Sequence, residues 1–166
     1  MKIGILSDIH GNSFALEAVC VELRNQEIKN LIVAGDLVGY YYDIKKVLFL
    51  LSSFQTTIIK GNHEDMLKQI MNDSESTDYI RAKYGSSLDK VLKDLDKKEI
   101  DYLTNLDHPK SIELDSVKIL VSHGSPWDIN EYLFQDCNKS LWQKFLEYSE
   151  DLFILGHTHQ QLIKKI

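Results

Sequence analysis

Five short polar segments hold most of the histidine and glycine in this chain. They contain five of the six histidines and six of the eight glycines, and they are residues 8–12, 35–39, 61–64, 123–124 and 156–159. Histidine together with carboxylate and amide oxygens, without cysteine, suits divalent metals such as Mn, Fe, Co, Ni or Zn. Glycine lets the backbone approach a ligand closely. The segments therefore indicate a metal site.

Seven residues of these segments are candidate metal ligands. They are Asp8, His10, Asp36, Asn62, His123, His157 and His159. One metal with open positions usually takes about three protein ligands, so seven favour two ions that share a carboxylate. Two cations about 3.5–4 Å apart can bind the attacking and the leaving oxygen of a phosphoryl displacement. Such a pair would suit phosphate-ester hydrolysis.

Each candidate has a structural alternative when it is taken alone. An aspartate after a strand is often a helix N-cap or a turn residue, and a single histidine is often a hydrogen-bonded turn residue. The pair His157 and His159 favours a metal by itself, because side chains two residues apart in an extended segment project to the same side. His108, which precedes Pro109 in a polar turn, is interpreted as structural. Five coincidences in five segments are improbable, so the metal interpretation is preferred.

The residues between the first polar segments alternate between strand and helix patterns. Residues 2–6, 31–34 and 56–59 are predicted strands. Two sets of apolar residues have helical spacing. The first is Leu16, Val19, Cys20 and Leu23, and the second, which follows Asp43 as a predicted N-cap, is Ile44, Val47, Leu48 and Leu51. Strands that alternate with helices predict a parallel sheet. The polar segments would then meet at the carboxyl ends of its strands, where ligands bind in open α/β sheets.

The second half of the chain reads differently. Residues 64–105 are predicted to form charged, solvated helices, and residues 111–114 and 117–121 a hairpin. Residues 140–148 are predicted to form a helix with Trp142, Phe145 and Leu146 buried. Residues 151–155 are predicted as a buried strand, and residues 162–165 as the start of one more.

Composition excludes several classes of protein. A chain of 166 residues is expected to form one domain. Its 25 acidic and 19 basic residues give a net charge of −6, which argues against a general binder of nucleic acid or of anionic membranes. Cys20 and Cys137 form no CxxC pair, which fits a reducing compartment. With neither a signal peptide nor an apolar span, the expected location is the cytoplasm.

The five segments, in this order, resemble the calcineurin-like metallophosphoesterases, above all their small single-domain prokaryotic phosphodiesterase branch. The matching motifs are SDIHGN, GDLVGY, GNHE, HGSPWD and GHTH. One motif alone is weak evidence, whereas all five in order are highly specific, and they cover residues 2 to 160. The resemblance implies an α/β fold, a four-layer αββα sandwich, in a single domain over residues 1–166.

The resemblance also implies a role for each candidate residue. The first metal would be held by Asp8, His10 and His159, the second by Asn62, His123 and His157, and Asp36 would bridge the two. A hydroxide between the metals would attack phosphorus, and His63 would stabilise the transition state or protonate the leaving group. Two divalent ions per chain are expected, with manganese favoured and Ni, Fe, Zn, Co or Mg as alternatives.

The expected function is hydrolysis of a small phosphodiester. A phosphomonoesterase or a protein phosphatase with the same metal core is one alternative, and a non-catalytic interaction scaffold is another. All seven ligand positions and His63 are present, which favours an enzyme. A P-loop nucleotide binder is excluded, because the chain has no GxxxxGK[ST] motif.

Three features remain open at this stage. Asn12 could cap the following helix or bind the phosphate. Tyr40, Tyr41 and Tyr42 could stack on a nucleobase or aryl group, although loop packing is preferred, and Trp127 presents the same choice. By the resemblance, further strands follow GHTH, so the second sheet is expected to lack its C-terminal strands here. Its open edge could then pair with another copy of the chain.

Overall fold

The first sheet is parallel and lies in the N-terminal part of the chain. The computed structural model describes residues 2–166, except for the side chains of residues 74–76. Strands β1 (Ile3–Leu6), β2 (Asn30–Ala34) and β3 (Gln55–Ile59) pair in that order, both times in parallel. The crossovers contain helices α1 (Ser13–Asn25) and α2 (Ile44–Leu51). The predicted βαβ units are thus confirmed.

The second sheet begins with the predicted hairpin. Strands β4 (Lys110–Leu114) and β5 (Val117–Ser122) pair antiparallel, and β6 (Leu152–Leu155) adds to β5 in parallel. Four helices lie between the two sheets in sequence: α3 (Asn62–Asn72), α4 (Ser74–Tyr84), α5 (Ser87–Asp94) and α6 (Lys97–Thr104). Helix α7 (Lys139–Gln143) and the 3₁₀ helix η1 (Lys144–Glu147) precede β6.

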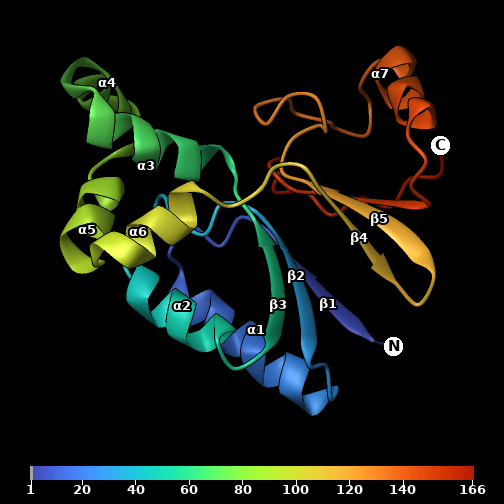
Figure 1. Ribbon diagram of the computed structural model, residues 1–166, viewed down its shortest axis with the longest axis horizontal. Coiled ribbons are helices and arrows are strands. Elements are labelled where there is room, and N and C mark those ends of the chain that lie inside the picture. The colour runs from blue at the N-terminus through green and yellow to red at the C-terminus, as the bar shows by residue number, and fades with distance from the viewer. Residues whose placement is uncertain (1) are drawn as a thin grey trace.

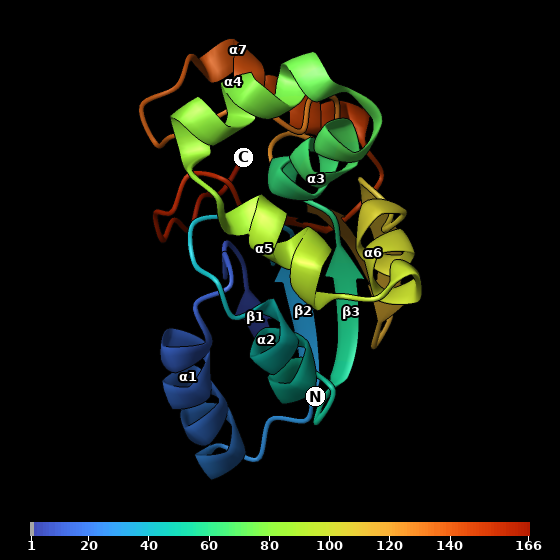
Figure 2. The same ribbon diagram turned by 90° about the vertical axis from the view of Figure 1, so that its left-hand side faces the viewer.

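The two sheets pack face to face between helical layers. Along β2, Leu31 and Val33 face the helices, whereas Ile32 and Ala34 pack against the second sheet. This alternation follows from the two-residue period of a strand. On the outer face of the second sheet, Phe145 packs with Phe153. Figures 1 and 2 show α1 and α2 covering the first sheet on the face away from the second. The four-layer αββα sandwich is therefore observed.

Some predictions about single elements were wrong. Val19 is exposed, because the buried row of α1 is narrower and consists of Leu16, Cys20 and Leu23 with Ser13. In α2, Leu50 is buried together with Ile44, Val47 and Leu51, whereas Leu48 of the predicted stripe is only partly buried. Residues 162–165 form no strand.

The predicted helix over residues 140–148 is also shorter than expected, because the chain changes to a 3₁₀ helix at Lys144. Three residues per turn place Leu146 about 120° away from Phe145, so Phe145 is buried and Leu146 is exposed. Both cysteines are free thiols. Among the residues that the structure describes, no helix is long and apolar enough to cross a bilayer.

Candidate metal centre

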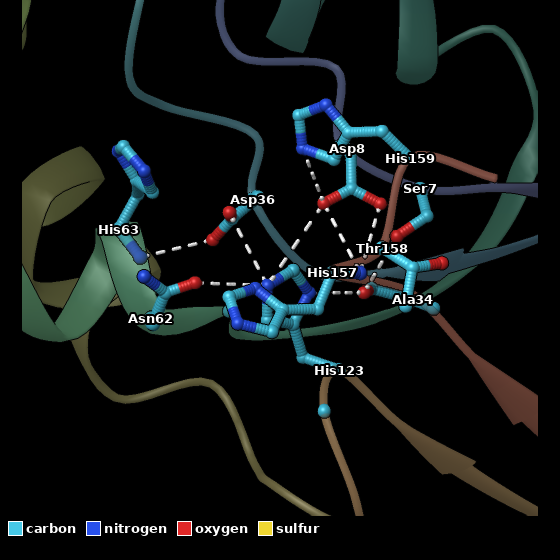
Figure 3. A network of polar contacts seen from close by, with 12 residues as sticks. Ser7, Asp8, Ala34, Asp36, Asn62, His63, His123, His157, Thr158 and His159 are labelled. Carbon is cyan, nitrogen blue, oxygen red and sulfur yellow. Dashed lines mark hydrogen bonds and ion pairs between the residues drawn. The ribbon is translucent and has the colours of Figure 1, made fainter. Parts of the chain in front are cut away.

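The candidate ligands gather at the carboxyl ends of strands from both sheets. Asp8 follows β1, Asp36 follows β2, and Asn62 begins α3 just after β3. From the second sheet, His123 follows β5, and the segment with His157 and His159 follows β6. Figure 3 shows these side chains converging although they are far apart in sequence. The predicted rim of polar residues thus exists in the fold.

Three groups of side chains are close enough to hold a metal ion, since their ligand atoms lie within 4.8 Å of one another. The groups are Asp8, His10 and His159; His10, Asp36 and His63; and Asp36, His123 and His157. His10 and Asp36 each belong to two groups, so the three groups form one continuous cluster. The structure therefore brings six of the seven predicted ligands into these groups, and it adds His63.

The seventh predicted ligand, Asn62, joins the cluster through His123. Its Oδ1 lies 3.0 Å from His123 Nε2. On the other side of the cluster, Asp8 Oδ1 lies 3.3 Å from His159 Nε2. Both carboxylate oxygens of Asp8 also accept hydrogen bonds from the backbone N–H of His157, at 3.2 and 3.1 Å. Asp8 thereby connects the first sheet to the segment after β6.

Asp36 lies at the middle of the cluster. Its Oδ2 is 3.2 Å from His123 Nε2 and 3.6 Å from His10 Nε2, and its Oδ1 accepts the backbone N–H of His63 at 2.9 Å. In Figure 3 it lies between His63 and His123. The carboxyl is almost fully buried. Burial opposes its ionisation, but the hydrogen bond and charge of His123 outweigh burial and lower the pKa of Asp36.

Backbone carbonyls fix the tautomers of three histidines. His10 Nδ1 lies 2.9 Å from the Val38 carbonyl oxygen, and His123 Nδ1 lies 2.8 Å from that of Ala34. Because a carbonyl accepts only, these nitrogens carry the proton, and in the neutral ring Nε2 keeps its lone pair. His157 Nε2 lies 3.1 Å from the Asn130 carbonyl oxygen, which leaves its Nδ1 available to bind a metal. This arrangement is the usual outer support of a metal-bound histidine.

The surroundings of His123 test whether a cation fits. The ring is completely buried, and its Nδ1 is hydrogen-bonded to the Ala34 carbonyl. Its Nε2 faces two oxygens, one from Asn62 and one from Asp36. In the protein alone, this nitrogen must carry a proton: burial lowers the pKa of His123, but the hydrogen bond and charge of Asp36 raise it to about 9. A divalent cation among the same three donor atoms would satisfy all of them. The donor set therefore fits a metal ion of the N/O-binding kind.

The backbone of the centre adopts a conformation that L-residues rarely take. Asp8, His10, Asp36, His157 and His159 all have positive φ, between 51° and 69°. Each such residue costs on the order of 1–3 kcal/mol and persists only when its surroundings enforce it. Positions like these cluster at functional sites. Five of the seven candidate ligands therefore share a strained backbone that the sequence pattern did not indicate.

Two glycines permit the close approach of these loops. A Cβ built on Gly61 would lie 2.1 Å from Asp36 Oδ1. At Gly39, where φ is +130°, it would lie 2.5 Å from His10 Nδ1 and 2.7 Å from His63 Nδ1. Any side chain would displace the carboxylate or the imidazoles. These positions therefore require glycine.

Glu64 is a residue of the site whose role was not predicted from the sequence. The side chain is fully buried, and its carboxylate accepts four backbone N–H groups, from Asp36, Leu37, Val38 and Gly61, at 2.7–3.0 Å. Burial and the charge of Asp36 raise its pKa to about 7, and the backbone donors oppose that rise. Glu64 thus joins the loop of Asp36 to the start of α3. Its place at the third position of that helix, as in a capping box, was the available signal.

His63 lies beside the cluster and has no fixed partner for one of its nitrogens. The ring is buried, and Nδ1 makes no hydrogen bond in the described structure. Burial lowers the pKa of His63 to about 4. The ring lies 4.7 Å from that of His10, centroid to centroid, at an angle of 71°. A buried, uncommitted imidazole next to candidate metal ligands is available for proton transfer.

Asn12, Trp127 and His108 have structural contacts in the fold. Asn12 caps α1, with its Oδ1 accepting the N–H of Ala15 at 3.1 Å. Trp127 packs against Phe145, as the preferred interpretation expected. His108 belongs to none of the three ligand groups, and its Nε2 lies 3.3 Å from Ser122 Oγ.

The sequence was compared with families of known proteins. The model of the calcineurin-like phosphoesterase superfamily domain matches residues 1–166, the whole chain. The chain belongs to this superfamily. The family comprises metal-dependent phosphoric ester hydrolases, and the three ligand groups are consistent with the divalent metal centre that it uses. The resemblance found in the motifs is thereby confirmed.

Individual relatives agree with this membership. An uncharacterised protein of Methanocaldococcus jannaschii is 33% identical over 165 residues, which are 95% of this chain and 62% of that protein. The chain thus spans less than two thirds of that relative. A phosphodiesterase of the same archaeon is 24% identical over 166 residues, all of this chain and 78% of the relative.

Solved structures show the same fold. A metallophosphoesterase from Sphaerobacter thermophilus has a TM-score of 0.69 and 26% identity, over 96% of this chain and 61% of that one. A protein from Pyrococcus horikoshii described as hypothetical has the same TM-score at 18% identity, over 92% of this chain and 68% of its own. The α/β sandwich is therefore that of metallophosphoesterases.

Proposed function

We propose that residues 1–166 form a single domain that binds two divalent metal ions and hydrolyses a phosphodiester. The observation that carries this proposal is the position of Asp36, whose Oδ2 lies between His10 Nε2 at 3.6 Å and His123 Nε2 at 3.2 Å. One carboxylate with a histidine on each side supports two cations next to each other. Two such cations can bind both oxygens of a phosphoryl displacement.

The ligands divide between the two sides of Asp36. The first ion is assigned to Asp8, His10 and His159, the second to Asn62, His123 and His157, and Asp36 is shared. The short distances within each set, such as 3.3 Å from Asp8 Oδ1 to His159 Nε2, support this division. Manganese is the favoured metal, and Ni, Fe, Zn, Co and Mg are compatible with the same donor types.

When bound, the ions would supply Lewis acidity toward the phosphate and lower the pKa of water. The chain's own residues hold the loops of the site in place and transfer a proton. Asp36 and Glu64 hold the loop after β2 against the start of α3. His63 is assigned to hold a proton for the leaving alcohol. Its pKa of about 4 without substrate results mainly from burial. The negative charge of a phosphate ester beside the ring would raise that pKa, whereas the charge of the two bound cations would lower it.

The preference for a diester rests on the relative named as a phosphodiesterase. The same core could serve a monoesterase or a protein phosphatase, and Asn12, although it caps α1, retains its proposed accessory role toward the phosphate. The substrate is expected to be a small phosphate ester, since a net charge of −6 disfavours general binding of nucleic acid.

The test is the rate of hydrolysis of an aryl phosphodiester and of the matching aryl monoester by the Mn²⁺-loaded protein. Faster turnover of the diester supports the proposal. Faster turnover of the monoester would make the chain a phosphomonoesterase. Metal binding without turnover of either ester would favour the non-catalytic scaffold.

A variant of His63 separates chemistry from metal binding. His63→Ala is expected to lower kcat by about 10²–10⁴-fold, the usual contribution of general acid catalysis. The metal content should stay close to that of the unaltered chain, because His63 is not among the assigned ligands. Loss of metal in this variant would instead make His63 a ligand, in the group that it forms with His10 and Asp36.

A further inference from the structure

Two tyrosine rings lie against the histidines at one side of the metal centre. Tyr40, in the loop after β2, is 4.7 Å from His10 and 5.1 Å from His63, measured between ring centroids. Tyr84, the last residue of α4, lies 5.1 Å from His63 and 6.3 Å from Tyr40. Four rings from different parts of the chain thus form one aromatic surface beside His63.

The loop after β2 gives Tyr40 a fixed place in this surface. The preceding residue, Gly39, is so close to His10 and His63 that a Cβ there would overlap both Nδ1 atoms. The next residue, Tyr41, donates its backbone N–H to the His10 carbonyl at 2.8 Å. Tyr40 is therefore held on both sides by backbone contacts with the metal-centre loops.

Tyr40 nevertheless remains open to solvent. Its exposed fraction is 48%, which is high for a residue that borders two buried histidines. Tyr84 is more enclosed, and Lys83 Nζ lies 5.0 Å from the centre of its ring. Tyr40 thus presents free aromatic surface at the centre, and the ring of Tyr84 lies next to it, 6.3 Å away between centroids.

The structure also separates Tyr40 from its two neighbours in the sequence. Tyr41 has a similar exposed fraction of 53%, but no ring contact between Tyr41 and the histidines of the centre is found among the described residues. The hydroxyl of Tyr42 lies 3.5 Å from Ser86 Oγ, and no ring contact between Tyr42 and those histidines is found among the described residues. Of the three tyrosines, Tyr40 is the one that borders the site.

We propose that Tyr40, supported by Tyr84, binds a planar aryl or nucleobase group on the ester arm of the substrate that lies beside His63. This inference rests on the proposed function, because it requires a phosphate ester at the metal centre. An aromatic ring with an exposed face stacks on any planar group and does not depend on its hydrogen-bonding pattern. Tyr40 would therefore select for a planar arm and tolerate different bases or aryl groups.

The two uncharged phenol rings of this surface fit the same substrate. Phenol rings add apolar contact without adding charge, so they favour the organic arm of the ester rather than its phosphate. The charge of the phosphate is left to the metal centre. Discrimination would thus be divided, with the ions binding phosphate in any ester and Tyr40 distinguishing planar from aliphatic arms.

The test compares two non-hydrolysable phosphonates of equal charge on the Mn²⁺-loaded protein. Benzylphosphonate and ethylphosphonate mimic an aryl and an alkyl phosphate, with CH₂ in place of the ester oxygen. Their dissociation constants are measured by calorimetry, together with that of inorganic phosphate. Benzylphosphonate should bind roughly tenfold more tightly than ethylphosphonate, a ratio typical of one aromatic stacking contact.

Three variants show which residue causes this ratio. Tyr40→Leu should reduce the ratio of the two dissociation constants to about one, whereas the affinity for inorganic phosphate stays the same. Tyr40→Phe should keep the ratio, because the ring and not the hydroxyl makes the contact. Tyr41→Leu, which changes an equally exposed tyrosine in the same loop, should also keep it.

The possible failures can be told apart. If the unaltered protein binds phosphate but binds both phosphonates equally, or if Tyr40→Leu keeps the preference, Tyr40 does not bind the arm and this inference is overturned alone. If neither phosphonate nor inorganic phosphate binds, the proposed phosphate-ester site fails, and the role of Tyr40 fails with it.

Discussion

The two sheets contribute different chemistry to the metal centre. The first sheet provides the oxygen ligands proposed here, Asp8, Asp36 and Asn62, together with His10. The second sheet provides only histidines: His123, His157 and His159. The first sheet lies between a large helical core and the second sheet, whereas the second has a small helical cover of which Trp142 and Phe145 are the main buried residues.

Burial does not follow this division, since His123 and His157 of the second sheet are buried as well. Asp36 and Asn62 are buried in the loops of the first sheet. On the second sheet, the side chain of His159 is 51% exposed, and Leu152 in β6 is 44% exposed. The solvent-exposed part of the site is therefore the end of the segment after β6, at His159. Metal ions bound between the two would link the sheets in addition to the apolar contacts between Ile32 and its neighbours.

The largest effect is expected where the two sides meet. Asp36→Asn removes the charge that lies between His10 and His123 and should lower kcat/KM for an aryl diester by more than about 100-fold, with loss of bound metal. Removal of outer support alone costs metal sites about 10–100-fold. Activity and metal content are measured together. Asp101→Asn, an exposed aspartate on α6, is the matched control. Full metal content in Asp36→Asn would end the assignment of a shared carboxylate.

A pair of leucines tests the difference in packing. Leu103 in α6 is fully buried, so Leu103→Ala should lower the free energy of unfolding by about 2–5 kcal/mol. Leu152→Ala, at the exposed first residue of β6, should cost less than about 1 kcal/mol. Urea denaturation of the metal-free protein measures both. Equal losses would mean that the difference in burial between these two positions does not determine their contribution to stability.

A variant of Glu64 tests whether metal affinity depends on a residue that is not an assigned ligand. Glu64→Gln replaces one carboxylate oxygen by an NH₂ group, which cannot accept the two backbone N–H groups that this oxygen binds. The loop of Asp36 should loosen, and metal affinity should fall by about 10–100-fold. Titration with Mn²⁺ measures the affinity, and Gln69→Glu, a change of the opposite kind later in α3, is the control. Unchanged affinity would show that Glu64 serves folding alone.

The smallest effect is expected for a helix cap far from the centre. Asp96 Oδ1 accepts the N–H of Glu99, and Glu99 in turn accepts the N–H of Asp96, both at 2.9 Å. Asp96→Ala should lower the free energy of unfolding by about 1 kcal/mol. Metal affinity should not change, since α6 supplies no ligand. A fall in metal affinity would show that the metal centre depends on the stability of the helices that precede the second sheet.

The sequence predicted the convergence of the five polar segments better than the details of the elements around them. The order of the strands, the hairpin and the convergence of the five segments followed from periodicity and from the rule that parallel strands end at one rim. The seven residues were proposed as ligands because histidine, aspartate and asparagine recur directly after strands, and their role as ligands stays a prediction. The packing of the two sheets came from the resemblance, since periodicity alone does not fix how two sheets face each other.

Other features depend on three-dimensional packing and were missed. The exposure of Val19 and Leu146 depends on how far a helix turns relative to its neighbour, which a stripe of apolar residues does not define. Positive φ at Asp8 or His157 results from the loops that converge there. The four hydrogen bonds to Glu64 come from two separate segments, so only the folded chain reveals them.

The central claim is that two metal ions share Asp36, and metal stoichiometry tests it most directly. The purified protein is saturated with Mn²⁺, passed over a desalting column, and analysed for metal per chain, with Asp36→Asn treated in the same way. We predict two ions per chain in the unaltered protein and one or none in the variant. One ion in both proteins would contradict a shared carboxylate and a dinuclear centre.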